Sequence, residues 1–243
     1  MIFTYEAYRG LLALLREQGY AIRDYHNYVD ASRCAILRHD IDTSLDQAVK
    51  LAELETKEGV RSTWFVLLRT DFYNAASKTG QEALRYIQSL GHEIGLHFDE
   101  ASYVPALGSD EVIENIIKEC GLLSALLETR VSTVSMHRPS AAALEADYVI
   151  PDVVNSYGKT FFHEFKYLSD SRRRWREPVE EIIRSGKYDR LHILLHAFWY
   201  HETEEDISQT VGNFIRSANR DRYHQMAENI TDIASILKEE DVL

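Results

Sequence analysis

The chain has 243 residues, of which 45% are apolar and 27% charged, and this is enough for one closed hydrophobic core of barrel size. Its 27 basic and 39 acidic residues give a net charge of −12, so the field of the protein repels a phosphate backbone and disfavours nucleic-acid binding. The two cysteines, Cys34 and Cys120, are too few for a disulfide framework or a thiolate zinc site. Any bound metal would therefore have nitrogen and oxygen ligands.

Nothing in the first 20 residues has the order of a signal peptide, because charged residues interrupt the apolar ones. No stretch approaches the roughly 18 uninterrupted apolar residues that a membrane span needs. We therefore expect a cytoplasmic protein with no membrane span.

The N-terminal half of the sequence alternates between helical and strand patterns. Apolar residues between 8 and 15 predict an amphipathic helix that Gly19 ends. Residues 34–37 are typical of a buried strand, and the polar residues 38–42 follow directly. Residues 43–46 have the spacing of a capping box, which predicts a helix that runs to about Glu58.

The same unit of strand, polar tip and helix recurs along the chain. Further strands are predicted at 62–68, 93–97, 131–136 and 191–196, and further helices at 81–90 and 110–127. This alternation favours a parallel sheet with helices outside it, and closure of the sheet removes its edges. The predicted class is α/β, a single irregular (β/α) barrel of about seven strands.

We expect one domain over residues 1–243, with a helical prelude at 1–30, the barrel at 31–201 and two C-terminal helices at 202–243. Pro151, Gly158 and a basic cluster interrupt any period between 148 and 180. That region is predicted to be a long, functional βα loop with short strands.

Polar side chains collect just beyond the apolar strands, where the carboxyl ends of barrel strands converge on one face. They are Asp40, Asp42, His97, Asp99, His137, Arg138 and His196. An Asp-x-Asp pair with a histidine from another strand suits a divalent ion with an open position for water. The alternative is that Asp42 caps the next helix and that the histidines are structural.

Four segments in order resemble the motifs of the polysaccharide deacetylase superfamily, also called NodB-homology or carbohydrate esterase family 4. They are Leu37-Arg-His-Asp-Ile-Asp42, Gly91-His-Glu-Ile-Gly-Leu-His97, His137-Arg-Pro-Ser140 and Leu194-Leu-His-Ala-Phe-Trp199. The Arg-His-Asp-x-Asp form is similar to a variant subgroup associated with bacterial surface-polysaccharide gene clusters. The resemblance covers roughly residues 35–200 and implies the deacetylase type of barrel.

The resemblance implies that Asp40 is the general base and that Asp42 and His97 are metal ligands. The family's second ligand histidine falls on Ala101, which cannot bind a metal. Three residues could replace that histidine: His137 from a neighbouring strand, Asp99 on the same face as His97, and His92 at the far end of the strand. His137 is favoured narrowly over Asp99, and His92 is the weakest.

Arg138 matches the family arginine that pairs with the catalytic aspartate, and His196 matches the general acid. Asp170 and Trp175 loosely resemble the family's aspartate-and-tryptophan motif, in which the carboxylate tunes the acid histidine. His192 is interpreted as a hydrogen-bonded core histidine.

Trp199 could wall the pocket and stack on a sugar face. Arg176 lies in the basic cluster of residues 172–176, which is either a solvated loop or a site for a substrate phosphate or carboxylate.

These roles imply a metal-dependent hydrolase that removes an N-acetyl group from an amino sugar of a polysaccharide or its precursor. The cofactor would be a divalent ion, zinc in the first place, with cobalt, nickel and manganese also compatible with the ligands. The missing second histidine motivates one alternative, a catalytically silent carbohydrate-binding relative. Another alternative is hydrolysis of a different non-peptide C–N bond.

Overall fold

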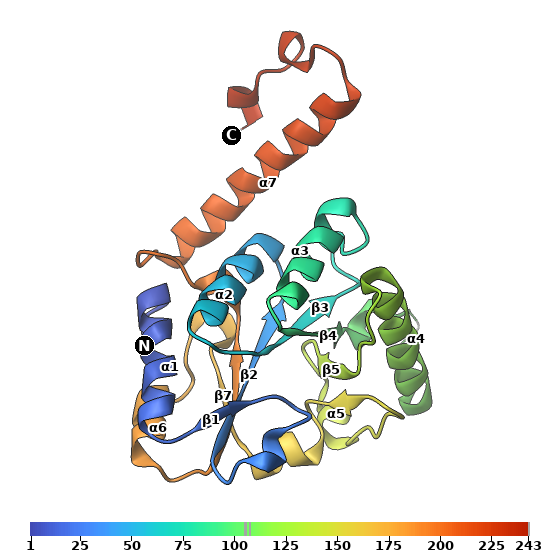
Figure 1. Ribbon diagram of the computed structural model, residues 1–243. Helices are drawn as coiled ribbons and strands as arrows, with labels where there is room; N and C mark the ends of the chain where they lie inside the picture. Colours follow the sequence, from blue (N-terminus) through green and yellow to red (C-terminus); the bar gives the residue numbers. More distant parts are fainter. Residues whose placement is uncertain (105, 107, 243) are drawn as a thin grey trace. The chain divides into compact units, whose positions relative to one another are not determined.

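A computed structural model describes residues 1–104, 106 and 108–242 of the chain (Figure 1). It divides into two compact units, residues 1–202 and residues 203–243. The expectation that the whole chain is one domain stays a prediction.

The first unit is built on one sheet in which every strand pairing is parallel, in the order β6-β5-β4-β3-β2-β8-β7, with the short β1 beside β2. The strands are β1 (Ala21–Arg23), β2 (Cys34–Ile41), β3 (Thr63–Leu67), β4 (Glu93–Phe98), β5 (Thr133–Met136), β6 (Val154–Asn155), β7 (Lys166–Ser169) and β8 (Arg190–Leu195). The predicted α/β class and the count of about seven strands are confirmed. Because all strands run the same way, their carboxyl ends lie along one edge of the sheet.

The strands at the two ends of the sheet order, β6 and β7, are connected by contacts between aromatic side chains. Within the part of the chain that the structure describes, no strand pairing connects them. The ring of Phe162 lies 5.4 Å from the ring of Tyr157, which follows β6, and 5.4 Å from the ring of Tyr167 in β7. The sheet therefore curls into an irregular barrel whose last gap is filled by aromatic rings.

Helices cover the outer face of the sheet (Figure 1). They are α1 (Tyr5–Glu17), α2 (Leu45–Lys57), α3 (Lys78–Ser89), α4 (Ser109–Leu127), α5 (Ala141–Glu145) and α6 (Val179–Ser185). Side chains alternate across a strand, so Ala35 and Leu37 of β2 join the large core that the helices share. Cys34 and Ile36 point into the barrel, where they belong to a smaller aromatic core.

His192 lies in that smaller interior region as a fully hydrogen-bonded histidine. Its Nε2 is 2.7 Å from the hydroxyl of Tyr25, and its Nδ1 is 3.2 Å from the carbonyl oxygen of Phe161. Burial, together with the positive charge of Arg38, holds the pKa of His192 well below its ordinary value. The interpretation of His192 as a core histidine is confirmed.

Strand β2 continues four residues beyond the apolar run that predicted it. The polar residues belong to the strand because each one has a partner on its own face. Arg38 and Asp40 pair inside the barrel, while His39 points outward to the buried Glu55, with its Nε2 2.8 Å from Oε1 of the carboxylate. Helix α2 begins one residue later than the predicted box, because Ser44 accepts the hydrogen bond from the Gln47 amide.

The segment between 148 and 180 contains β6 and β7, a π-helical turn at Thr160–Glu164 and a 3₁₀ turn at Ser171–Arg173. The predicted long loop with short strands is confirmed in its structure.

Over its described residues, 203–242, the second unit contains one α-helix, α7 (Ile207–Asn229), and two 3₁₀ turns, Ile233–Ser235 and Glu239–Val242. The prediction of two C-terminal helices is therefore wrong, because Asp232 takes a left-handed conformation with φ 59° and only short turns follow it. None of the helices within the described ranges is long and apolar enough to cross a membrane.

Candidate metal and catalytic site

Five predicted site residues meet at the carboxyl edge of the sheet. Asp40 is the next-to-last residue of β2, and Asp42 comes directly after that strand. His97 lies near the end of β4, His137 follows β5 and His196 follows β8. The strand register sets Leu67 beside His97 and His97 beside Ser135, so the ends of β3, β4 and β5 are level.

Asp42, His97 and His137 form a group that could hold a metal ion. Oδ1 of Asp42 lies 3.3 Å from Nε2 of His97 and 3.4 Å from Nδ1 of His137, and the two ring nitrogens are 3.0 Å apart. A tetrahedral zinc ion with bonds of about 2.0–2.1 Å would separate its ligand atoms by about 3.3 Å. The three donor atoms therefore have the spacing that such an ion requires.

The surroundings of these atoms also fit a metal. Nδ1 of His97 is 3.3 Å from the Ser135 carbonyl oxygen, so the proton on Nδ1 is donated there and the lone pair of Nε2 faces Asp42. Oδ1 of Asp42 is buried and accepts no hydrogen bond within the described part of the chain.

The other two candidates for the third ligand have structural partners. Asp99 caps a 3₁₀ turn, in which its Oδ1 accepts from the Ala101 amide at 3.1 Å and its Oδ2 from the Ser102 hydroxyl at 2.8 Å. His92 is buried before the start of β4, where its Nε2 lies 3.0 Å from the Ala52 carbonyl oxygen. Of the three, the structure brings only His137 to Asp42 and His97.

Asp40 is paired with an arginine that the sequence reasoning missed. Nη2 of Arg38 donates to Oδ2 of Asp40 at 3.0 Å, and both side chains are buried. The prediction that Arg138 makes this contact is wrong in this structure: Arg138 is exposed, with φ 45°, and no ion pair joins it to Asp40 among the described residues. Residues two apart on a strand share a face, which is the signal that could have identified Arg38.

His196 and Asp170 form a second hydrogen-bonded pair beside the group. Nδ1 of His196 is 2.6 Å from Oδ1 of Asp170, and Oδ2 of Asp170 accepts from the His196 amide and from the Tyr200 hydroxyl, each at 3.1 Å. Nε2 of His196 is left to face the site and lies 3.8 Å from Oδ2 of Asp42. Burial would lower the pKa of His196, but the charges of Asp170, Asp42 and Asp40 raise it to about 9.

For the three residues predicted to bind substrate, the structure gives the burial and packing of each side chain but no contact with a substrate. Trp175 and Trp199 are half-buried and pack against the large core, and Arg176 is exposed. Two neighbours of Arg176 in the basic cluster, Arg172 and Arg173, have left-handed backbone with φ 60° and 56°. The substrate contacts of Trp175, Trp199 and Arg176 stay predictions.

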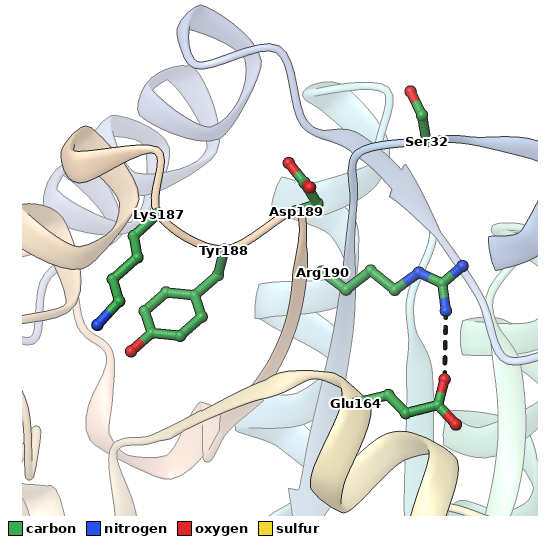
Figure 2. A pocket seen from close by; sticks show the side chains of 6 residues that line it. All are labelled: Ser32, Glu164, Lys187, Tyr188, Asp189 and Arg190. Atoms are coloured by element: carbon green, nitrogen blue, oxygen red, sulfur yellow. Dashed lines mark ion pairs between the residues drawn. The ribbon is translucent and has the colours of Figure 1, made fainter.

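A surface pocket of about 470 Å³ lies elsewhere, and Figure 2 shows its lining. Its residues are Ser32, Glu164, Lys187, Tyr188, Asp189 and Arg190. Arg190 begins β8, whereas His196 follows the end of the same strand, so the pocket is at the opposite edge of the sheet. Three of its charged residues are in ion pairs, with Arg190 3.5 Å from Glu164 and Asp189 3.1 Å from Arg33.

Comparison with known proteins finds no family model and no curated protein that matches the chain. Solved structures that resemble it include the deacetylase PplD of Streptococcus pyogenes in complex with acetate, at 12% identity and a TM-score of 0.46 over 60% of this chain and 69% of that one. BA3943 of Bacillus anthracis, described as a pseudoenzyme of the CE4 family, has 16% identity and a TM-score of 0.44. This chain covers 75% of its own length but only 60% of BA3943, less than two thirds.

The peptidoglycan deacetylase PdaC of Bacillus subtilis is also similar, at 13% identity and a TM-score of 0.44 over 80% of this chain and 97% of that one. All three likenesses are distant, with TM-scores below 0.5.

Proposed function

We propose that the chain is a metal-dependent hydrolase that removes the N-acetyl group of an amino sugar in a polysaccharide or its precursor. The observation that carries the proposal is the triangle of donor atoms from Asp42, His97 and His137, with Asp40 and His196 beside it. The resemblance of the sequence motifs to polysaccharide deacetylases supports the choice of an N-acetyl sugar.

Asp42, His97 and His137 would hold the divalent ion, and zinc is the ion that this donor set suits first. When bound, the ion supplies Lewis acidity to the amide carbonyl oxygen and to the attacking water. Two nitrogens and one oxygen from the protein would leave one position of a tetrahedral ion open.

The chain's own residues supply the proton transfers. Asp40 takes a proton from water as the water oxygen bonds to the amide carbon. His196 gives the proton on its Nε2 to the sugar nitrogen as the C–N bond breaks, so acetate and a free amine leave. Asp170 holds the imidazole through Nδ1 and so keeps Nε2 toward the reacting atoms.

The test compares the wild type with Asp42→Asn, using zinc titration after chelation and acetate release from N-acetylglucosamine oligomers. The wild type should hold one equivalent of zinc and release acetate, whereas Asp42→Asn should lose affinity and turnover by about 100-fold or more. Asp46→Asn is the matched control, because Asp46 is an exposed residue of α2 outside the site.

Two results would contradict the proposal. Stoichiometric zinc without acetate release from any N-acetylated sugar, but with sugar binding, would favour the silent carbohydrate-binding alternative. Turnover of small cyclic amides in the absence of acetate release would favour hydrolysis of another C–N bond.

A further inference from the structure

Arg38 is fixed inside the barrel on three sides. Its Nη1 donates to the Ser156 hydroxyl at 2.8 Å, and its Nη2 donates to Oδ2 of Asp40 at 3.0 Å and to the Tyr157 hydroxyl at 3.4 Å. The guanidinium carbon lies 4.9 Å from the centre of the Tyr157 ring and 5.5 Å from that of Phe65. Since the side chain has no exposed surface, these contacts determine its orientation.

The segment that holds Arg38 comes from the far end of the strand order. Ser156 and Tyr157 directly follow β6, whereas Arg38 is in β2. The backbone anchors the segment, because the Ser156 amide donates to the Val134 carbonyl oxygen at 2.9 Å and the Tyr157 amide donates to Oδ1 of Asn155 at 3.0 Å. The arginine therefore bridges the barrel interior from one wall to another.

The contact with Arg38 also distinguishes the two carboxylate oxygens of Asp40. Oδ2 accepts from Arg38, while Oδ1 is buried without a hydrogen-bond partner in the described part of the chain. A buried acceptor without a donor costs free energy unless another group donates a hydrogen bond to it. Oδ1 is therefore the carboxylate oxygen of Asp40 that is left to accept a proton.

We propose that Arg38 is the positioning residue of Asp40, and that Ser156 and Tyr157 hold Arg38 so that Oδ1 of Asp40 receives the proton. This proposal rests on the proposed function where it makes Asp40 the base. It transfers to Arg38 the role that the sequence motif gives to Arg138.

The experiment replaces Arg38 by lysine, which keeps the charge but loses the planar fork that reaches Ser156 and Asp40 together. We expect Arg38→Lys to lower kcat for acetate release by about 10- to 100-fold. KM and zinc affinity should stay within about twofold of the wild type, since a residue that positions the base contributes to the reaction and not to ground-state binding. Ser156→Ala should reduce kcat in the same way but by less, because the contact with Asp40 remains.

Arg85→Lys is the matched control, because Arg85 is an exposed arginine of α3 that pairs with Glu128. Arg138→Lys tests the rival assignment and should cost less kcat than Arg38→Lys. A larger loss in Arg138→Lys than in Arg38→Lys, or an equal loss of zinc affinity and kcat in Arg38→Lys, would overturn the proposal.

A second measurement needs no activity. The melting temperatures of Arg38→Lys, Asp40→Asn and the double variant form a cycle, and the two losses should not add because the residues act as a pair. Additive losses would show that Arg38 does not hold Asp40. If the wild type releases no acetate but the losses are non-additive, the proposed function fails while the pairing of Arg38 with Asp40 stands.

Discussion

At the scale of single residues, His137 lies beside Asp42 and His97 in the group that could hold a metal ion, although it is 40 positions away from His97 in the sequence. Ala101 stands at the position where the family motif has its ligand, but the strand order places β5 beside β4. His137 therefore reaches Asp42 from the end of the neighbouring strand, which no motif along the sequence specifies.

We predict that His137→Ala weakens zinc affinity by about 100-fold or more, because loss of a direct ligand costs more than the 10–100-fold typical of outer partners. Calorimetric titration of the chelated protein with zinc measures the change. Asp99→Ala is the matched control, since Asp99 caps a turn and has no donor atom in the group. An equal loss of affinity in Asp99→Ala would assign the third ligand to Asp99 instead.

Tyr200 is a further residue that the motifs did not reveal. Its hydroxyl donates to Asp170, and its ring packs 5.5 Å from those of Phe3 and Tyr8 in the N-terminal segment. Residues of the N-terminal segment therefore pack against Tyr200, the tyrosine that donates a hydrogen bond to Asp170.

Tyr200→Phe keeps the ring and removes one hydrogen bond to a carboxylate, so we expect the free energy of unfolding to fall by about 1–3 kcal/mol. We also expect kcat to fall while KM is unchanged, because Asp170 orients His196. Chemical denaturation and steady-state kinetics measure the two effects. Unchanged stability and unchanged kcat would show that this hydrogen bond contributes nothing to the pair.

At the scale of elements, apolar runs are enough to predict strands β2, β3, β4, β5 and β8 and helices α1 to α4, but not how far each strand extends. The apolar run underestimates the length of strand β2, because Arg38, His39 and Asp40 are polar. Their burial depends on partners that lie far along the chain. Similarly, the sequence motif indicated Asp40, Asp42, His97 and His196, whereas the pairing of Arg38 with Ser156 depends on the curl of the sheet. Tertiary contacts of this kind leave no local pattern.

Gly95 of β4 shows how tightly the barrel interior is filled. A Cβ atom there would lie 2.6 Å from the Phe65 ring and 2.6 Å from the Thr133 hydroxyl oxygen. We predict that Gly95→Ala lowers the free energy of unfolding by about 1–3 kcal/mol through overpacking. Urea denaturation measures this change.

Gly121, in the interior of α4, is the matched control for Gly95, because a Cβ atom there meets nothing within 4 Å. Gly121→Ala should stabilise the protein by about 0.5–1 kcal/mol, since alanine is the better helix former. Equal effects of the two substitutions would contradict the argument from packing.

At the scale of the whole molecule, the net charge of −12 does not describe the buried ionisable groups. The pKa values of these buried groups determine how the stability of the fold depends on pH. The interior holds Arg38 near His192, and the outer face of the sheet holds Glu55 between His39 and His92. Burial lowers the pKa of both His92 and His192. The folded protein therefore keeps His192 neutral at pH values where the unfolded chain binds protons.

Acid should therefore destabilise the fold before the carboxylates are protonated. Below the unfolded histidine pKa of about 6.5, His192 binds up to one more proton in the unfolded state than in the folded state, so stability falls by at most about 1.4 kcal/mol for each pH unit. We predict that His192→Gln, whose amide can accept from Tyr25 and donate to Phe161, reduces this slope by about 1.4 kcal/mol per unit between pH 6 and pH 5. Urea denaturation at several pH values measures the slope. His163→Gln is the control, because His163 is exposed in the folded state, and a slope equally reduced by both substitutions would place the effect outside the barrel interior.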